Sequence, residues 1–162
     1  MKMKKIILFS LIALCFTACQ SEPGGSLRET DLMPYGIPVS IMAPDSAEIK
    51  ADDLGGGLIK DVTIRGKDNY NVQVFATQAE TSDMARIKAG QLADVKSIRF
   101  FEKIINEEED GFIYQTAIDS NNISYNFRYI VLQGDLEIIF QAGFLGTFSQ
   151  EEAERMYQAV QQ

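Results

Sequence analysis

This chain of 162 residues lacks the side chain most often used in acid–base catalysis. It has no histidine, which is the commonest general base and the commonest metal ligand. Its two cysteines, Cys15 and Cys19, both lie near the N-terminus, so no disulfide framework can be drawn. A Ser-Lys or paired-carboxylate site is formally open, but no spacing marks one. We therefore expect no catalytic residue, no cofactor and no metal.

A group of polar side chains on a predicted sheet is the best candidate for a binding site. In the register derived below, one face carries Gln115, Ser124, Asn126, Arg128 and Gln141. An arginine can hold an anion or a partner carboxylate through two parallel hydrogen bonds. The alternative is an ordinary solvated face on which Arg128 pairs with a local acid such as Glu137.

The strands that must position this group lie between Gly111 and Gly143. Turn signals at 119–122 and at Gly134-Asp135 separate three runs rich in β-branched and aromatic residues, which predicts an antiparallel meander. Gly134-Asp135 is typical of a type II′ hairpin. That turn pairs Val131 with Ile138, Tyr129 with Phe140 and Arg128 with Gln141. A loop of four residues at 119–122 would set Ile118 opposite Ile123 and Tyr114 opposite Phe127.

These registers divide the meander into an apolar face and a mixed face. The apolar face holds Phe112, Tyr114, Ile118, Tyr125, Phe127, Tyr129, Val131, Ile138 and Phe140. The mixed face has Ile113, Ile130, Leu132 and Ile139 toward one end and the polar group toward the other. We expect a helix to cover its apolar half and the polar half to be open or covered by a loop.

The remaining segments predict an α+β fold with an antiparallel sheet of about six or seven strands. Strands are predicted at 39–42, 48–50, 58–65 and 70–77, and the first two are expected to pair as a hairpin. Thr77 and Glu80 have the spacing of a capping box, which predicts a long helix that ends near Ser97. Residues 100–109 can extend that helix or form a strand, and we favour a strand over 101–108. A second capping box, Ser149 to Glu152, predicts a C-terminal helix with a buried stripe of Ala153, Met156, Tyr157 and Val160.

Charge and composition limit the partners. The net charge of −8 argues against nucleic-acid binding, because phosphate binding needs clustered Lys and Arg. The acidic run at 107–110 lacks the alternating oxygen ligands of an EF-hand, so we interpret it as a charged turn.

The N-terminus has the pattern of an export signal. Three lysines precede an apolar run, which is followed by Phe16-Thr17-Ala18-Cys19. This pattern is typical of a signal peptide, and the run is too short for a confident membrane span. The last four residues resemble the lipobox of bacterial lipoproteins, in which cleavage precedes a cysteine that becomes acylated. Phe16 departs from the usual aliphatic residue. An ordinary secretory signal with an incidental cysteine is the alternative.

The lipobox resemblance implies a signal peptide over 1–18 and a membrane anchor, with palmitate among its acyl chains, on Cys19. Cleavage would remove three lysines and no acid, taking the net charge from −8 to −11. A chain so acidic gains no attraction to an anionic bilayer, so acyl chains must hold it there. Gln20 resembles the residue that follows the cysteine in outer-membrane lipoproteins. We expect the protein to be located on the periplasmic side of the outer membrane, with inner-membrane retention or surface display as alternatives.

The order of the predicted elements resembles the PsbP-like fold from about Tyr35 onward. Tyr35-Gly36-Ile37 before a strand that ends at Pro44, and Phe148-Ser149 before the last helix, carry this resemblance. The family often has a tryptophan after the first proline turn, and this chain has none. The resemblance implies a non-catalytic accessory or binding protein.

These observations together predict a flexible tether over 19–34 and a single domain over 35–162. The predicted function is that of a lipid-anchored envelope protein that binds another envelope protein or a small anionic ligand. An envelope hydrolase that uses carboxylate, Lys or Tyr side chains is the alternative.

Overall fold

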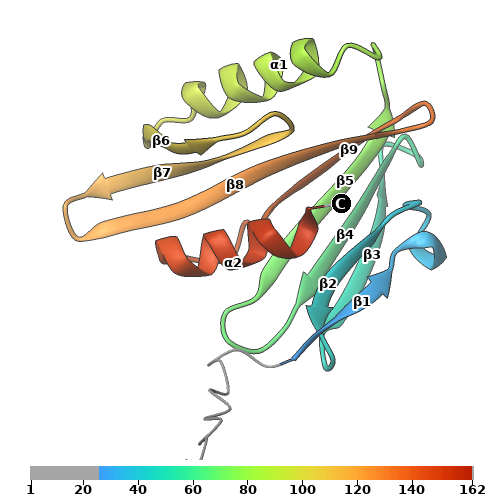
Figure 1. Ribbon diagram of the computed structural model, residues 1–162, viewed down its shortest axis with the longest axis horizontal. Helices are drawn as coiled ribbons and strands as arrows, with labels where there is room; N and C mark the ends of the chain where they lie inside the picture. Colours follow the sequence, from blue (N-terminus) through green and yellow to red (C-terminus); the bar gives the residue numbers. More distant parts are fainter. Residues whose placement is uncertain (1–25, 162) are drawn as a thin grey trace, which may run out of the picture.

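A seven-stranded antiparallel sheet forms the frame of the computed structural model, which describes residues 26–161 (Figure 1). Its strand order is β3-β4-β5-β9-β8-β7-β6. The bounds are β3 Glu48–Leu54, β4 Ile59–Arg65, β5 Asn71–Gln78, β6 Phe101–Glu107, β7 Gly111–Asp119, β8 Asn122–Gln133 and β9 Leu136–Ala142. Helix α1 (Met84–Ser97) connects β5 to β6, and α2 (Gln150–Val160) follows β9. The fold is α+β, as predicted from the sequence.

One face of the large sheet is covered by α2 and by a small second sheet (Figure 1). That second sheet pairs β1 (Leu27–Asp31) with β2 (Ser40–Pro44), and a 3-10 turn at Met33–Tyr35 lies between them. The main core of the protein lies here. Its members from the meander and α2 include Ile113, Phe127, Tyr129, Ile138, Phe140, Met156 and Tyr157.

The opposite face is covered by α1 over part of its area. Ile87 contacts Ile130 and Ile139. Val95, further along α1, packs with Phe112 and Tyr114. Side chains alternate between the two faces of a strand, which is how β8 and β9 supply apolar residues to both layers.

The β8–β9 hairpin has the predicted register. Val131 pairs with Ile138, Tyr129 with Phe140 and Arg128 with Gln141. Gly134 has a φ of 65°, and Asp135 is not among the residues with positive φ, as a type II′ turn requires. The predicted assignment of β8 and β9 side chains to the two faces is therefore confirmed.

The predicted register of β7 is wrong by one residue. Phe127 pairs with Ile113, Asn126 pairs with Tyr114, and an irregularity between Ala117 and Asp119 leaves Ile118 outside the ladder. A shift of one residue moves every side chain of a strand to the other face. Phe112 and Tyr114 therefore face α1, Ile113 joins the main core, and Ile118 is 67% exposed.

The first helix is shorter than predicted, while the second agrees with the prediction. Strand β5 continues through Thr77 to Gln78, and Asp83 caps α1 by accepting a hydrogen bond from the Arg86 N–H at 3.1 Å. The predicted capping box at Thr77 is therefore wrong. The predicted end near Ser97 and the strand at β6 are confirmed. The capping box at Ser149 and the buried stripe of α2 are also confirmed.

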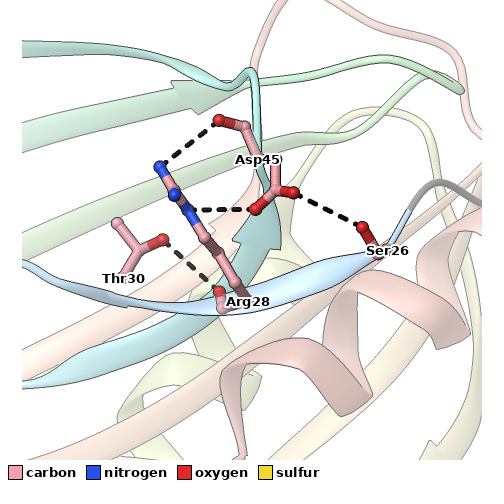
Figure 2. Close-up of polar contacts among 4 residues, drawn as sticks. All are labelled: Ser26, Arg28, Thr30 and Asp45. Atoms are coloured by element: carbon pink, nitrogen blue, oxygen red, sulfur yellow. Dashed lines mark hydrogen bonds and ion pairs between the residues drawn. The ribbon is translucent and has the colours of Figure 1, made fainter.

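The structured part of the chain begins earlier than the expected start at Tyr35. Residues 27–31, assigned from sequence to a flexible tether, form β1 and pair with β2. The expected pairing of β2 with Glu48–Lys50 is wrong, because β3 pairs with β4. Arg28 on β1 forms an ion pair with Asp45 after β2 (Nε to Oδ1, 3.1 Å), as Figure 2 shows. Both side chains are well exposed, so this pair adds little stability.

Candidate functional site

A pocket opens on the α1 face of the sheet, at the end where α1 finishes. Its volume is about 430 Å³. We call it the Arg128 pocket. It is lined by Ile98, Phe100, Tyr114, Thr116, Ile118, Asn122, Ile123, Ser124, Asn126, Arg128, Gln141, Ala142, Gly143, Phe144, Gly146 and Thr147. Helix α1 covers the apolar half of the face, and this pocket occupies the polar half, which agrees with the division expected from the sequence.

Three of the four predicted binding residues line this pocket. Asn126 and Arg128 come from β8, and Gln141 comes from β9. Gln115 does not, because the register of β7 turns its side chain toward the α2 face, where it donates a hydrogen bond to Glu102 at 2.8 Å. The tyrosine beside it takes the place expected for Gln115, since Tyr114 pairs with Asn126 and lines the pocket.

The Arg128 guanidinium contacts Gln91 on α1 and the Tyr114 hydroxyl. Its Nη1 donates to Oε1 of Gln91 on α1 at 3.0 Å, and Nε2 of Gln91 donates to Oε1 of Glu137 at 3.2 Å. Gln91 therefore bridges Arg128 and Glu137, so the direct pair considered as the alternative is replaced by an indirect contact. None of the ion pairs among residues 26–161 includes Arg128. Its Nε is buried and has no hydrogen-bond partner within this part of the chain.

Tyr114 adds a hydroxyl next to this cation. Burial raises the pKa of Tyr114 above its ordinary value, and the nearby Arg128 charge and its hydrogen bond lower it in part. The net effect is a raised pKa, so Tyr114 keeps its proton at neutral pH. The pocket floor thus combines one cation with a neutral hydroxyl and the amides of Asn126 and Gln141.

The mouth of the pocket is apolar, which sequence reasoning missed. Phe144 is 73% exposed and Ile118 is 67% exposed, and both line the pocket together with the partly exposed Ile98, Phe100 and Ile123. Phe144 also packs on Phe75, with 6.2 Å between ring centroids. The sequence offered one signal, the pair Phe144-Leu145 between glycines in a segment too short for a buried element.

The acidic run before β7 contacts α1 and the C-terminal end of the chain around α2. Glu107 pairs with Lys88 at 3.1 Å. Glu108 accepts hydrogen bonds from the Tyr157 hydroxyl at 3.1 Å and from Gln161 at 2.8 Å. Within residues 26–161 no group of His, Cys, Asp and Glu is placed to hold a metal ion.

The predicted signal peptide over 1–18 and the predicted acylation site Cys19 lie outside the described residues. Over residues 26–161, neither helix is long and apolar enough to cross a bilayer.

No protein-family model, curated protein or solved structure matches the chain.

Proposed function

We propose that this protein is a lipid-anchored, non-catalytic binding protein of the bacterial cell envelope, and that its ligand occupies the Arg128 pocket. The outer membrane, periplasmic side, is the proposed location, based on the lipobox resemblance and Gln20. The acyl chains on Cys19 would hold the domain at the membrane, because its strongly negative charge gives no attraction to anionic lipid.

The observation that carries this proposal is the buried Nε of Arg128, which has no hydrogen-bond partner among residues 26–161. A buried guanidinium nitrogen without a partner is costly, so a site that keeps one has an unmet need for an acceptor. In a protein of net negative charge, a local cation on a concave surface attracts anions selectively. The volume of about 430 Å³ lies within the range of small-molecule sites.

The composition of the pocket favours binding over hydrolysis. Its described lining contains no Asp, Glu, Lys or Cys. The paired acids of a carboxylate-based hydrolase are therefore missing from this pocket. Ser124, the one serine in the lining, accepts a hydrogen bond from the Phe148 N–H at 3.1 Å instead of contacting a base.

Native mass spectrometry on Arg128→Gln tests the proposal. The full chain is purified from a bacterial host in mild detergent, and species that stay bound to it are measured. We expect a bound species in the wild type that Arg128→Gln loses. The unfolding free energy should change by less than about 2 kcal/mol, because the substitution gives up one hydrogen bond to Gln91 and also removes the buried, unpartnered Nε.

The matched control is Arg86→Gln, which removes the same charge from an exposed position on α1 outside the pocket. It should retain the bound species. Equal retention in the wild type and Arg128→Gln would contradict the proposal. A large loss of stability in Arg128→Gln would instead assign Arg128 a structural role.

A further inference from the structure

The Arg128 pocket combines two surfaces that call for different chemistry. Its floor presents a guanidinium, and its mouth presents exposed apolar side chains. Exposed apolar groups of this size, gathered in one place, mark interaction sites in soluble domains. An occupant that satisfies both surfaces must carry an acceptor at one end and an apolar body at the other.

The floor has the donors for a carboxylate. Nη1 of Arg128 already donates to Gln91, whereas Nε has no partner within residues 26–161. An arginine guanidinium carries five N–H donors, which match the oxygens of a carboxylate. The protonated Tyr114 hydroxyl beside the guanidinium supplies a further donor.

The charge of the floor fits a single negative charge better than a phosphate. Arg128 is the only Lys or Arg in the described lining. A phosphomonoester carries close to two negative charges at neutral pH, and one of these would be left without a counter-charge. Arg99 is close by but is not part of the lining. Its guanidinium stacks on the Phe100 ring, with 5.2 Å from Cζ to the ring centroid.

The pocket offers a peptide little to bind. It lies on a sheet face where the backbones of β7, β8 and β9 are paired with their neighbours. An extended peptide therefore finds no free strand edge there, although edges are where peptides add to sheets. A compact molecule can fill the volume of about 430 Å³ without needing such an edge.

We infer that the ligand of the Arg128 pocket is a small amphiphilic carboxylate. Its carboxylate binds Arg128, and its apolar body lies between Phe100 and Ile118 on one side and Phe144 on the other. This inference rests on the binding function proposed above and adds the chemical class of the ligand.

Three related probes distinguish the contribution of the carboxylate head to the affinity from that of the apolar body. Phenylbutyrate has both, phenylbutyramide has the same body with a neutral head, and butyrate has the head alone. Calorimetric titration of the full chain in lipid nanodiscs, with empty nanodiscs subtracted, measures their affinities. We expect phenylbutyrate to bind at least about tenfold more tightly than either partial probe.

Variants assign this binding to the pocket. Arg128→Gln should lower the affinity for phenylbutyrate to the affinity for the amide, whereas Arg86→Gln should leave the affinity for phenylbutyrate unchanged. Phe144→Ser should lower the affinity for phenylbutyrate by about threefold to tenfold, because an apolar contact is lost. The matched control Leu58→Ser removes an equally exposed apolar side chain from the β3–β4 turn and should have no effect.

Equal affinity for the acid and the amide, or acid binding that survives Arg128→Gln, would overturn the inference. Tighter binding by an apolar tripeptide with a free C-terminus would also overturn it, in favour of a peptide end. Phenylbutyl phosphate binding more tightly than phenylbutyrate would overturn the carboxylate class. If these probes fail while Arg128→Gln still loses the natural bound species, the inference falls and the proposed binding function stands.

Discussion

Close packing around two residues of the meander sets how α2 lies on the sheet. Gly111 at the start of β7 is so close to the Arg128 carbonyl oxygen and the Tyr157 hydroxyl that a Cβ there would lie 2.6 Å from each. Only glycine lets the three elements approach this closely. Phe127 is fully buried, and its ring meets that of Tyr157 edge-on, with 5.8 Å between centroids.

Phe127→Ala should lower the unfolding free energy by about 3–5 kcal/mol, because the cavity lies in the main core where α2 cannot collapse into it. Urea denaturation of the full chain measures this loss. Ile123→Ala on the same strand is the control, since its side chain is 36% exposed and its truncation should cost less than about 1 kcal/mol. Equal midpoints for both variants would contradict the assignment of Phe127 to the core.

The residues of the candidate site could be predicted only where a local turn defined the register. Arg128 and Gln141 were placed together because Gly134-Asp135 leaves one way to pair β8 with β9. Gln115 was misplaced because the irregularity at Ile118 has no clear sequence signal. Gln91 contacts Arg128 only because of the way α1 lies across the sheet, and the sequence of α1 does not specify that placement.

At the scale of whole elements, the same capping-box spacing predicted the start of one helix correctly and that of the other wrongly. Ser149 and Glu152 form the reciprocal capping box expected from their spacing. Thr77 and Glu80 have the same spacing, but Thr77 pairs with Glu137 in the sheet, and Asp83 caps the helix instead. Strand pairing therefore outweighed the local preference of this segment.

Ser149→Ala should lower the unfolding free energy by about 1 kcal/mol, because the Glu152 N–H loses its acceptor at 3.2 Å. Thermal denaturation at neutral pH measures the loss. Gln150→Ala, inside the first turn but outside the box, is the control and should stay close to wild type. A wild-type melting temperature for Ser149→Ala would show that α2 is held by its packing alone.

The same box predicts how stability depends on pH. Burial raises the pKa of Glu152, but hydrogen bonds donated by Ser149 and Asn69 outweigh it, so the pKa lies below its ordinary value of 4.5. A lowered pKa stabilises the fold above the unfolded-state pKa, and this contribution disappears as pH falls through the folded-state pKa. The stability difference between wild type and Glu152→Ala should therefore shrink as pH falls below about 4.5. A difference that is constant with pH would contradict this.

At the scale of the whole molecule, local sequence signals predicted the individual strands and helices better than the order of the strands in the sheet. The meander and α2 follow from turns and caps within short segments. The pairing of β5 with β9 joins residues more than 55 positions apart, for example Gln78 with Leu136. The pairing of β1 with β2 covers a core that extends beyond the meander. Such contacts depend on which apolar faces meet, and alternation along one strand does not specify its neighbour.

The proposed membrane anchor and the proposed binding pocket can be tested by separate mutations. Cys19→Ala should block acylation, leave an uncleaved or soluble precursor, and remove the mature protein from the detergent-extracted membrane fraction, because the acyl chains are the proposed attachment. Labelling of cells with an alkyne analogue of palmitate, followed by fractionation, measures both effects. Cys15→Ala is the control, since Cys15 lies within the proposed signal peptide and its loss should leave labelling of the mature protein unchanged. If Cys19→Ala is labelled and fractionates like the wild type, the anchor assigned to Cys19 is wrong, whatever the Arg128 pocket binds.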